Sequence, residues 1–135
     1  MPPLLSHLAL AMSLALFHLV GPVPADLGVH GGSLSACPSS AHCARVNWAV
    51  ADPEAALSSV RKALLTMPRT TLVEQSGGYL HATVSSALFG FVDDVELYAD
   101  PGHGRLQARS VSRLGDSDLG VNARRLAALE AALPG

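Results

Sequence analysis

The stretch FGFVDDVELYADPGHGRLQARSVSRLGDSDLGVNARR, residues 89–125, decides the fold of this chain. It holds five of the nine Lys and Arg residues and six of the eleven Asp and Glu residues, mixed with apolar residues at strand spacing. A turn-forming run, Asp100–Gly104, separates two strand-like segments. We therefore predict a β-hairpin followed by the start of a helix, carrying either a fixed polar network or a binding surface.

The register of this hairpin follows from keeping guanidinium groups off the apolar face. A register that pairs Val95 with Arg109 would turn the arginines toward the core. A register shifted by one residue turns them to the opposite face. We therefore predict the pairs Val95–Ala108, Leu97–Leu106 and Asp94–Arg109, with the arginine row turned outward.

In that register Asp93 faces the interior, opposite Ser110 and near Ser112. An unpaired buried carboxylate costs several kcal/mol. We therefore expect hydroxyl groups or backbone amides to reach Asp93.

A helix and an earlier hairpin precede this stretch. Asp52-Pro53-Glu54 is a strong helix start, with Asp52 as N-cap, and Pro68 ends that helix. Strands at 70–75 and 79–86 flank Gly77-Gly78, a two-residue hairpin signal. The turn pairs residues Ser76 with Tyr79, Glu74 with His81 and Val73 with Ala82, and makes His81 an exposed partner of Glu74 rather than a catalytic base.

After residue 113 a turn-forming run leads to a final helix. Asn122 suits its N-cap, and Leu126, Leu129 and Leu133 form one apolar stripe. The prediction is an α+β fold, a four-stranded antiparallel meander flanked by an N-terminal and a C-terminal helix packed on one sheet face.

The first residues are typical of an export signal. Leu8–Val20 is apolar but shorter than the about 20 residues that a membrane span needs. Small residues precede a predicted cleavage after Ala25. We predict a signal peptide at 1–25, with an uncleaved anchor as the alternative, then a tether at 26–46 and a single domain at 47–135.

Cys37 and Cys43 frame the sequence CPSSAHC. In an oxidising compartment a disulfide is the first interpretation, and so small a ring contributes about 2–2.5 kcal/mol on chain-entropy grounds. The alternative is a metal site that recruits His42 and His30, which the spacing of zinc ligands disfavours.

Composition excludes some classes of function. The net charge is −2, without a basic run, which argues against a nucleic-acid-binding protein. No phosphate-binding loop or dinucleotide fingerprint is present, so we expect no cofactor.

Two motifs make the chain recognisable. F-V-D-D-V-E falls on Phe91–Glu96, and R-S-x-S-R-x-G-x-S-D-x-G-x-N-x-x-R falls on Arg109–Arg125. Together with LGVHGGSLSACPSSAHC, they resemble the domain-of-unknown-function family numbered 1499, found in exported and membrane-associated bacterial proteins. The resemblance spans roughly residues 27–133. It implies export and a common fold, and it implies no activity.

The candidate site residues come from these motifs and form either a ligand site or a polar network. They are Asp93, Asp94, Glu96, Arg109, Ser110, Ser112, Arg113, Ser117, Asp118, Asn122 and Arg125. We identify no catalytic residue and no metal ligand among them.

Three chemical interpretations of these residues can be weighed. Asp94 and Glu96 share a strand face and could act as acid and base, although a guanidinium opposite Asp94 would hold it ionised. Ser110 and Ser112 lack a credible base. The arginines of the second motif, with Arg124, could bind a phosphate or carboxylate at the helix start. Alternatively, Asp116 and Asp118 could neutralise these arginines and fix the turn to the sheet.

We therefore expect a small exported domain without catalysis, a binding or accessory module of the cell envelope. The alternative is an envelope hydrolase that uses Asp94 and Glu96 as acid and base. We expect a monomer whose partner is an unidentified envelope ligand or protein, with membrane contact only through an uncleaved leader.

Overall fold

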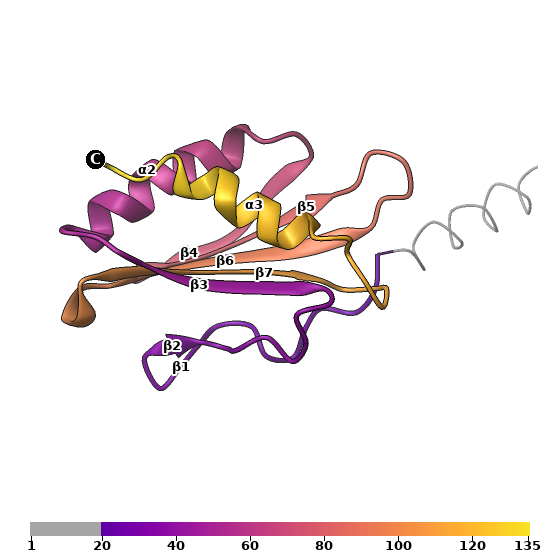
Figure 1. Cartoon of the computed structure of the whole chain (residues 1–135), viewed down its shortest axis with the longest axis horizontal. Helices are drawn as coiled ribbons and strands as arrows, with labels where there is room; N and C mark the ends of the chain where they lie inside the picture. The colour runs from indigo at the N-terminus through magenta and orange to yellow at the C-terminus, as the bar shows by residue number, and fades with distance from the viewer. Residues whose placement is uncertain (1–19) are drawn as a thin grey trace, which may run out of the picture.

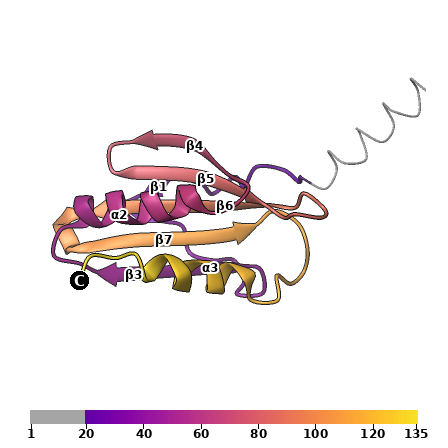
Figure 2. The same ribbon diagram turned by 90° about the horizontal axis from the view of Figure 1, so that it is seen from above.

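The computed structural model describes residues 20–135, so the predicted leader lies outside the described residues except for its last six positions. A five-stranded antiparallel sheet has the order β3-β7-β6-β5-β4, and two helices lie on one of its faces (Figures 1 and 2). The elements are β1 Val29–His30, β2 Ser33–Leu34, β3 Cys43–Ala49, α2 Pro53–Thr66, β4 Thr70–Ser76, β5 Tyr79–Ser85, β6 Val92–Asp100, η1 Pro101–His103, β7 Arg105–Ser112 and α3 Val121–Glu130. Within the described residues, none of the helices is long and apolar enough to span a bilayer.

The α+β class is confirmed, and the predicted four-stranded meander is extended by one strand. β3 pairs antiparallel with β7 and begins at Cys43, inside the segment that we expected to be a tether. The sequence of β3 alternates between apolar and polar residues. Ala44, Val46 and Trp48 turn to the helices, and the residues between them are polar. Sequence analysis missed β3, because the strand with which it pairs, β7, follows more than 50 residues later.

The core lies between this sheet and the two helices. Asp52 caps α2 as predicted, because its carboxylate accepts a hydrogen bond from the Ala55 amide at 3.1 Å. The fully buried leucines and valines of both layers are Val60, Leu64, Leu80, Val95, Leu97, Leu106 and Leu129. Their burial supplies the hydrophobic stabilisation that holds the helices to the sheet.

The predicted register of the second hairpin is wrong by two residues. Val95 lies opposite Ser110, and Glu96 rather than Asp94 lies opposite Arg109. The strands extend to the pair Asp100–Arg105, so the connection is shorter than we expected. Because a shift of two residues preserves the face of every side chain, the arginine row still points away from the helices.

In the first hairpin the pairs Ser76–Tyr79 and Glu74–His81 are confirmed. The pair Val73–Ala82 is wrong, because a β-bulge at Val73 places Leu72 opposite Ala82. Leu72 packs against the core, and Val73 is 55% exposed. Because of the bulge, Leu72 rather than Val73 faces the core, and Val73 faces solvent.

The start of α3 also differs from the prediction. Gly120 is the N-cap residue, with a left-handed backbone (φ 82°), and Asn122 is buried inside the first turn. The apolar stripe is present in Leu126 and Leu129, and Leu133 packs beyond the end of the helix.

Residues 20–42, which we call the arm, run along the sheet face opposite the helices (Figure 1). The predicted disulfide between Cys37 and Cys43 is confirmed and joins the arm to the start of β3. A disulfide fits the oxidising environment of an exported protein.

Candidate functional site

The predicted site residues separate into two clusters on opposite faces of the sheet. Asp94, Glu96, Arg109 and Arg113 face the arm, and Asp93, Ser110, Ser112, Asp118, Asn122 and Arg125 lie on the helix side. Ser117 is exposed, and its hydroxyl accepts a hydrogen bond from the Leu119 amide at 3.3 Å. The four arginines proposed to grip one anion are therefore not brought together.

On the helix side, Asn122 is the centre of a hydrogen-bonded network. Its side-chain carbonyl accepts from Ser110 Oγ at 2.6 Å. Its amide donates to Ser112 Oγ at 2.8 Å and to Asp118 Oδ2 at 2.7 Å. This network ties the first turn of α3 to β7.

Asp118 holds the turn before α3. Its carboxylate accepts from the Gly120 amide at 2.7 Å and from the Asn122 amide at 3.1 Å. Burial acts against the charged form, but these hydrogen bonds outweigh it, so the pKa of Asp118 lies below its usual value.

Asp93 faces the helix side as predicted, but its neighbours differ. It lies opposite Ser112 rather than Ser110, and it forms a salt bridge with Arg125, whose Nη2 lies 2.9 Å from Asp93 Oδ2. Arg125 Nη1 also donates to Ser110 Oγ at 3.0 Å. Each polar group thus has a protein partner, which supports a structural role for this cluster.

On the arm side, Asp94 is fully buried and bonded to the side chains of Arg113 and His81. Arg113 donates to both carboxylate oxygens, from Nε at 2.8 Å and from Nη2 at 3.0 Å. His81 Nε2 lies 2.7 Å from Asp94 Oδ1 and donates to it when it carries the proton. Burial would raise the pKa of Asp94, but these two hydrogen bonds outweigh it, and the pKa lies below its usual value.

Glu96 forms a second buried centre beside it. Its Oε2 accepts from the Tyr79 hydroxyl at 2.7 Å and from the Gly28 amide at 2.7 Å, and Oε1 accepts from Arg109 Nη1 at 3.2 Å. Arg109 also donates to Asp26 in the arm at 2.7 Å. Burial, followed by the bond to Glu96, raises the pKa of the Tyr79 hydroxyl, which stays protonated.

The expectation of a solvent-facing row is therefore wrong. Arg109 is 1% exposed, and Asp94 and Glu96 are 0% exposed, because the arm covers them. His81 is also buried, and its bonded partner is Asp94 rather than Glu74. Neither carboxylate can reach a substrate in this arrangement.

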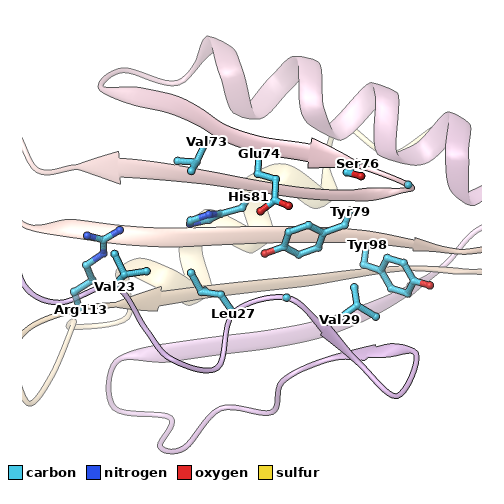
Figure 3. A pocket seen from close by; sticks show the side chains of 12 residues that line it. Val23, Leu27, Val29, Val73, Glu74, Ser76, Tyr79, His81, Tyr98 and Arg113 are labelled. Atoms are coloured by element: carbon cyan, nitrogen blue, oxygen red, sulfur yellow. The ribbon is translucent and has the colours of Figure 1, made fainter.

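A groove of about 660 Å³ lies between the arm and strands β4 and β5 (Figure 3). Val23, Leu27 and Val29 from the arm and Val73 from β4 supply its apolar lining. Its polar lining is formed by Glu74, Ser76, Tyr79, His81, Tyr98 and Arg113. The groove has the size and the mixed lining of a small-ligand site.

Two nitrogen atoms of the groove have no bonded partner among the described residues. They are His81 Nδ1 and Arg113 Nη1. The other side-chain nitrogens of these two residues bond to Asp94. Their side chains lie at the same end of the groove, near Val23 and Val73 (Figure 3). A ligand oxygen at this end could accept a hydrogen bond from Arg113.

Sequence reasoning missed four groups on the arm side, Asp26, Gly28, Tyr79 and His81. The alternation of Tyr79, His81 and Thr83 was visible and places them on one strand face. Nothing local indicated that the arm would cover this face. Within residues 20–135, no group of three or more His, Cys, Asp or Glu side chains could hold a metal ion.

Residues 33–133 match the family described as Protein of unknown function (DUF1499). The chain belongs to this family. The DUF1499 match contains the whole five-stranded sheet and both helices, and it begins after Val23, Leu27 and Val29 of the groove. No curated protein and no solved structure matches the chain.

Proposed function

We propose that this DUF1499 protein is a non-catalytic module of the cell envelope that binds a small ligand in the groove between the arm and the sheet. The observation that carries the proposal is a pair of nitrogens without a bonded partner among the described residues, His81 Nδ1 and Arg113 Nη1, at one end of a groove with a mixed lining. The ligand would combine an apolar body with an oxygen acceptor. The apolar body would contact Leu27 and Val73, which remain after cleavage at Ala25, and the oxygen would lie beside Arg113.

The buried layer beneath the groove supports a binding role. Asp94 bonds to both side chains, so Arg113 and His81 are held in place before a ligand arrives. Preorganised polar groups lose little conformational entropy on binding.

The alternative, a hydrolase with Asp94 and Glu96 as acid and base, has less support. Both carboxylates are fully buried and already accept hydrogen bonds from cationic side chains. His81 could be a base oriented by Asp94, but no hydroxyl or thiol among the described residues bonds to its ring. A nucleophile and base within hydrogen-bond reach is what such catalysis requires.

Export is part of the proposal. The apolar run and the small residues before Asp26 support it from the sequence, and the disulfide fits it chemically. Thiol alkylation of protein taken from the cell envelope should leave Cys37 and Cys43 unlabelled until a reductant is added. Rapid labelling without reductant would contradict export into an oxidising compartment.

The groove can be tested with the aromatic sulfonate 1-anilinonaphthalene-8-sulfonate, which has an apolar body and oxygen acceptors. We expect Val73→Asp to weaken its binding at least tenfold, because the substitution puts a carboxylate in the apolar wall. Val73 is already exposed, so the fold should tolerate the change. Fluorescence titration measures the affinity.

A matched control is Leu119→Asp, which introduces the same charge at an exposed apolar position outside the groove. We expect this variant to bind the probe as the unmodified chain does. Equal binding by the Val73→Asp variant, or a loss only in the Leu119→Asp variant, would refute the groove as the ligand site.

A further inference from the structure

Within the described residues, five of the eight exposed large apolar side chains lie in two connections of the chain, and a sixth lies at the start of α3. The β5–β6 connection carries Leu88, Phe89 and Phe91, and the β7–α3 connection with the first residue of α3 carries Leu114, Leu119 and Val121. Both connections lie at the same end of the sheet in two perpendicular views (Figures 1 and 2). We call these six residues the apolar end.

Five of the six residues of the apolar end are linked by a ring contact or by a shared hollow. The rings of Phe89 and Phe91 lie 5.6 Å apart. Phe91, Leu114, Leu119 and Val121 line a single hollow of about 460 Å³, whose remaining lining is mostly polar. Contiguous exposed apolar surface on a small domain marks an interaction site.

Leu119 provides an independent observation. Its side chain is 83% exposed, and its backbone is left-handed, with φ 55°. That conformation costs a residue such as leucine about 1–2 kcal/mol, and glycine would avoid the cost. Neither packing nor backbone geometry therefore accounts for a leucine at this position, which points to a contact outside the fold.

The start of the chain identifies the partner. The arm begins at this same end, where Gly21 lies so close to Leu114 that a Cβ atom would sit 2.8 Å from its Cγ. The sequence before it is apolar from Leu8 to Val20, and no charged side chain occurs before Asp26. In the uncleaved form, an apolar leader is therefore joined to the fold beside an apolar surface.

We propose that the apolar end docks on a lipid bilayer, with both connections in the interfacial layer. Phenylalanine and leucine side chains suit the boundary between headgroups and acyl chains. The exposed arginines Arg69 and Arg124 flank the surface and can reach lipid phosphates with their long stems in the interface. The inference is independent of the groove, which lies between the arm and β4.

Hydrogen–deuterium exchange of the full chain tests the docking, alone and reconstituted in vesicles of phosphatidylcholine and phosphatidylglycerol. We expect vesicles to slow amide exchange at least fivefold in residues 86–91 and 114–121. Exchange at the hairpin tip, residues 101–104, lies at the other end of the strands and should not change. Unchanged exchange at the apolar end would show that only the leader holds the protein, and would overturn the proposal.

Two variants separate docking from other causes of protection. Phe89→Asp combined with Leu119→Asp should abolish the protection of both connections, and Asp tolerates the left-handed position of Leu119. Val73→Asp, the matched control in the groove, should keep it. If the double variant is unstable, Leu88→Asp alone should still reduce the protection at least twofold.

A second copy of the chain is the competing occupant of this surface. Exchange without vesicles at several protein concentrations distinguishes the two. Protection that rises with protein concentration in the absence of lipid would overturn docking on a bilayer in favour of self-association.

Discussion

At the scale of single residues, Asp94 matters most for the stability of the buried network. It has no solvent exposure, and it compensates the charge of Arg113 while fixing the ring of His81. A buried ion pair contributes little over an apolar pair, but removal of one partner leaves the other charge buried and unpaired. The network is therefore most sensitive to loss of this carboxylate.

We predict that Asp94→Asn lowers the free energy of unfolding by about 3 kcal/mol, since Arg113 loses its only ionised partner among the described residues. Urea denaturation measures the change. The exposed Asp116→Asn should alter stability by less than about 0.5 kcal/mol. Equal effects of the two substitutions would contradict the importance of the buried pair.

The same substitution changes the response to acid. The pKa of Asp94 in the folded protein lies below the usual value of about 3.9, so its stabilising effect is complete above that pH and disappears as the pH falls through the folded pKa. Below about pH 4, the stability of the unmodified chain should thus fall more steeply than that of the Asp94→Asn variant. The pKa values of Asp100 and Asp118 are also lowered, so both proteins should lose stability in acid.

At the scale of elements, the entry to α3 combines tight hydrogen bonding with backbone strain. Asn122 and Asp118 anchor the first turn to β7, while Leu119 stands exposed between them with positive φ. Strain that the surrounding bonds enforce is a common feature of positions with a role outside folding.

We predict that Leu119→Gly raises the free energy of unfolding by about 0.5–1 kcal/mol, because glycine removes the left-handed strain and the lost side chain contributes no core contact. The midpoint of urea unfolding measures the gain. On vesicles, the same variant should show weaker protection of residues 114–121, despite its higher stability. A destabilised variant would indicate that Leu119 packs against the fold.

At the scale of the whole molecule, the arm turns one sheet face from surface into interior. Asp26 accepts from Arg109, and the Gly28 amide donates to Glu96, so the arm bonds to both buried groups and leaves only Arg109 Nε without a partner among their described atoms. The arm also supplies one wall of the groove. Stability of the arm and ligand binding should therefore be coupled.

We predict that Asp26→Ala loosens the arm, because Arg109 loses its bond across the interface. The expected cost in global stability is about 1 kcal/mol, since Glu96 still compensates Arg109. Limited proteolysis should cleave residues 20–35 several times faster than in the unmodified chain. Cleavage elsewhere should keep its rate, and an unchanged rate within the arm would show that this bond does not hold it.

Alternation along the strands was readable from the sequence. It placed Asp93 with Val95 and Leu97 on the helix side and the arginine row on the other, and it survived an error of two residues in register. Capping of α2 by Asp52 and pairing of the two cysteines were local as well. Each depends on residues a few positions apart, so the chain carries the information in short segments.

The rest was decided only by the tertiary structure. Strand β3 pairs with a segment more than 50 residues later, and Asp26 bonds to Arg109 across 83 positions of sequence. Whether Asp94, Glu96 and Arg109 form a surface or a buried network depends on the segment that covers them. Whether the arm covers these residues depends on the burial and hydrogen bonding between segments that lie far apart in the sequence. No local pattern of residues encodes those contacts.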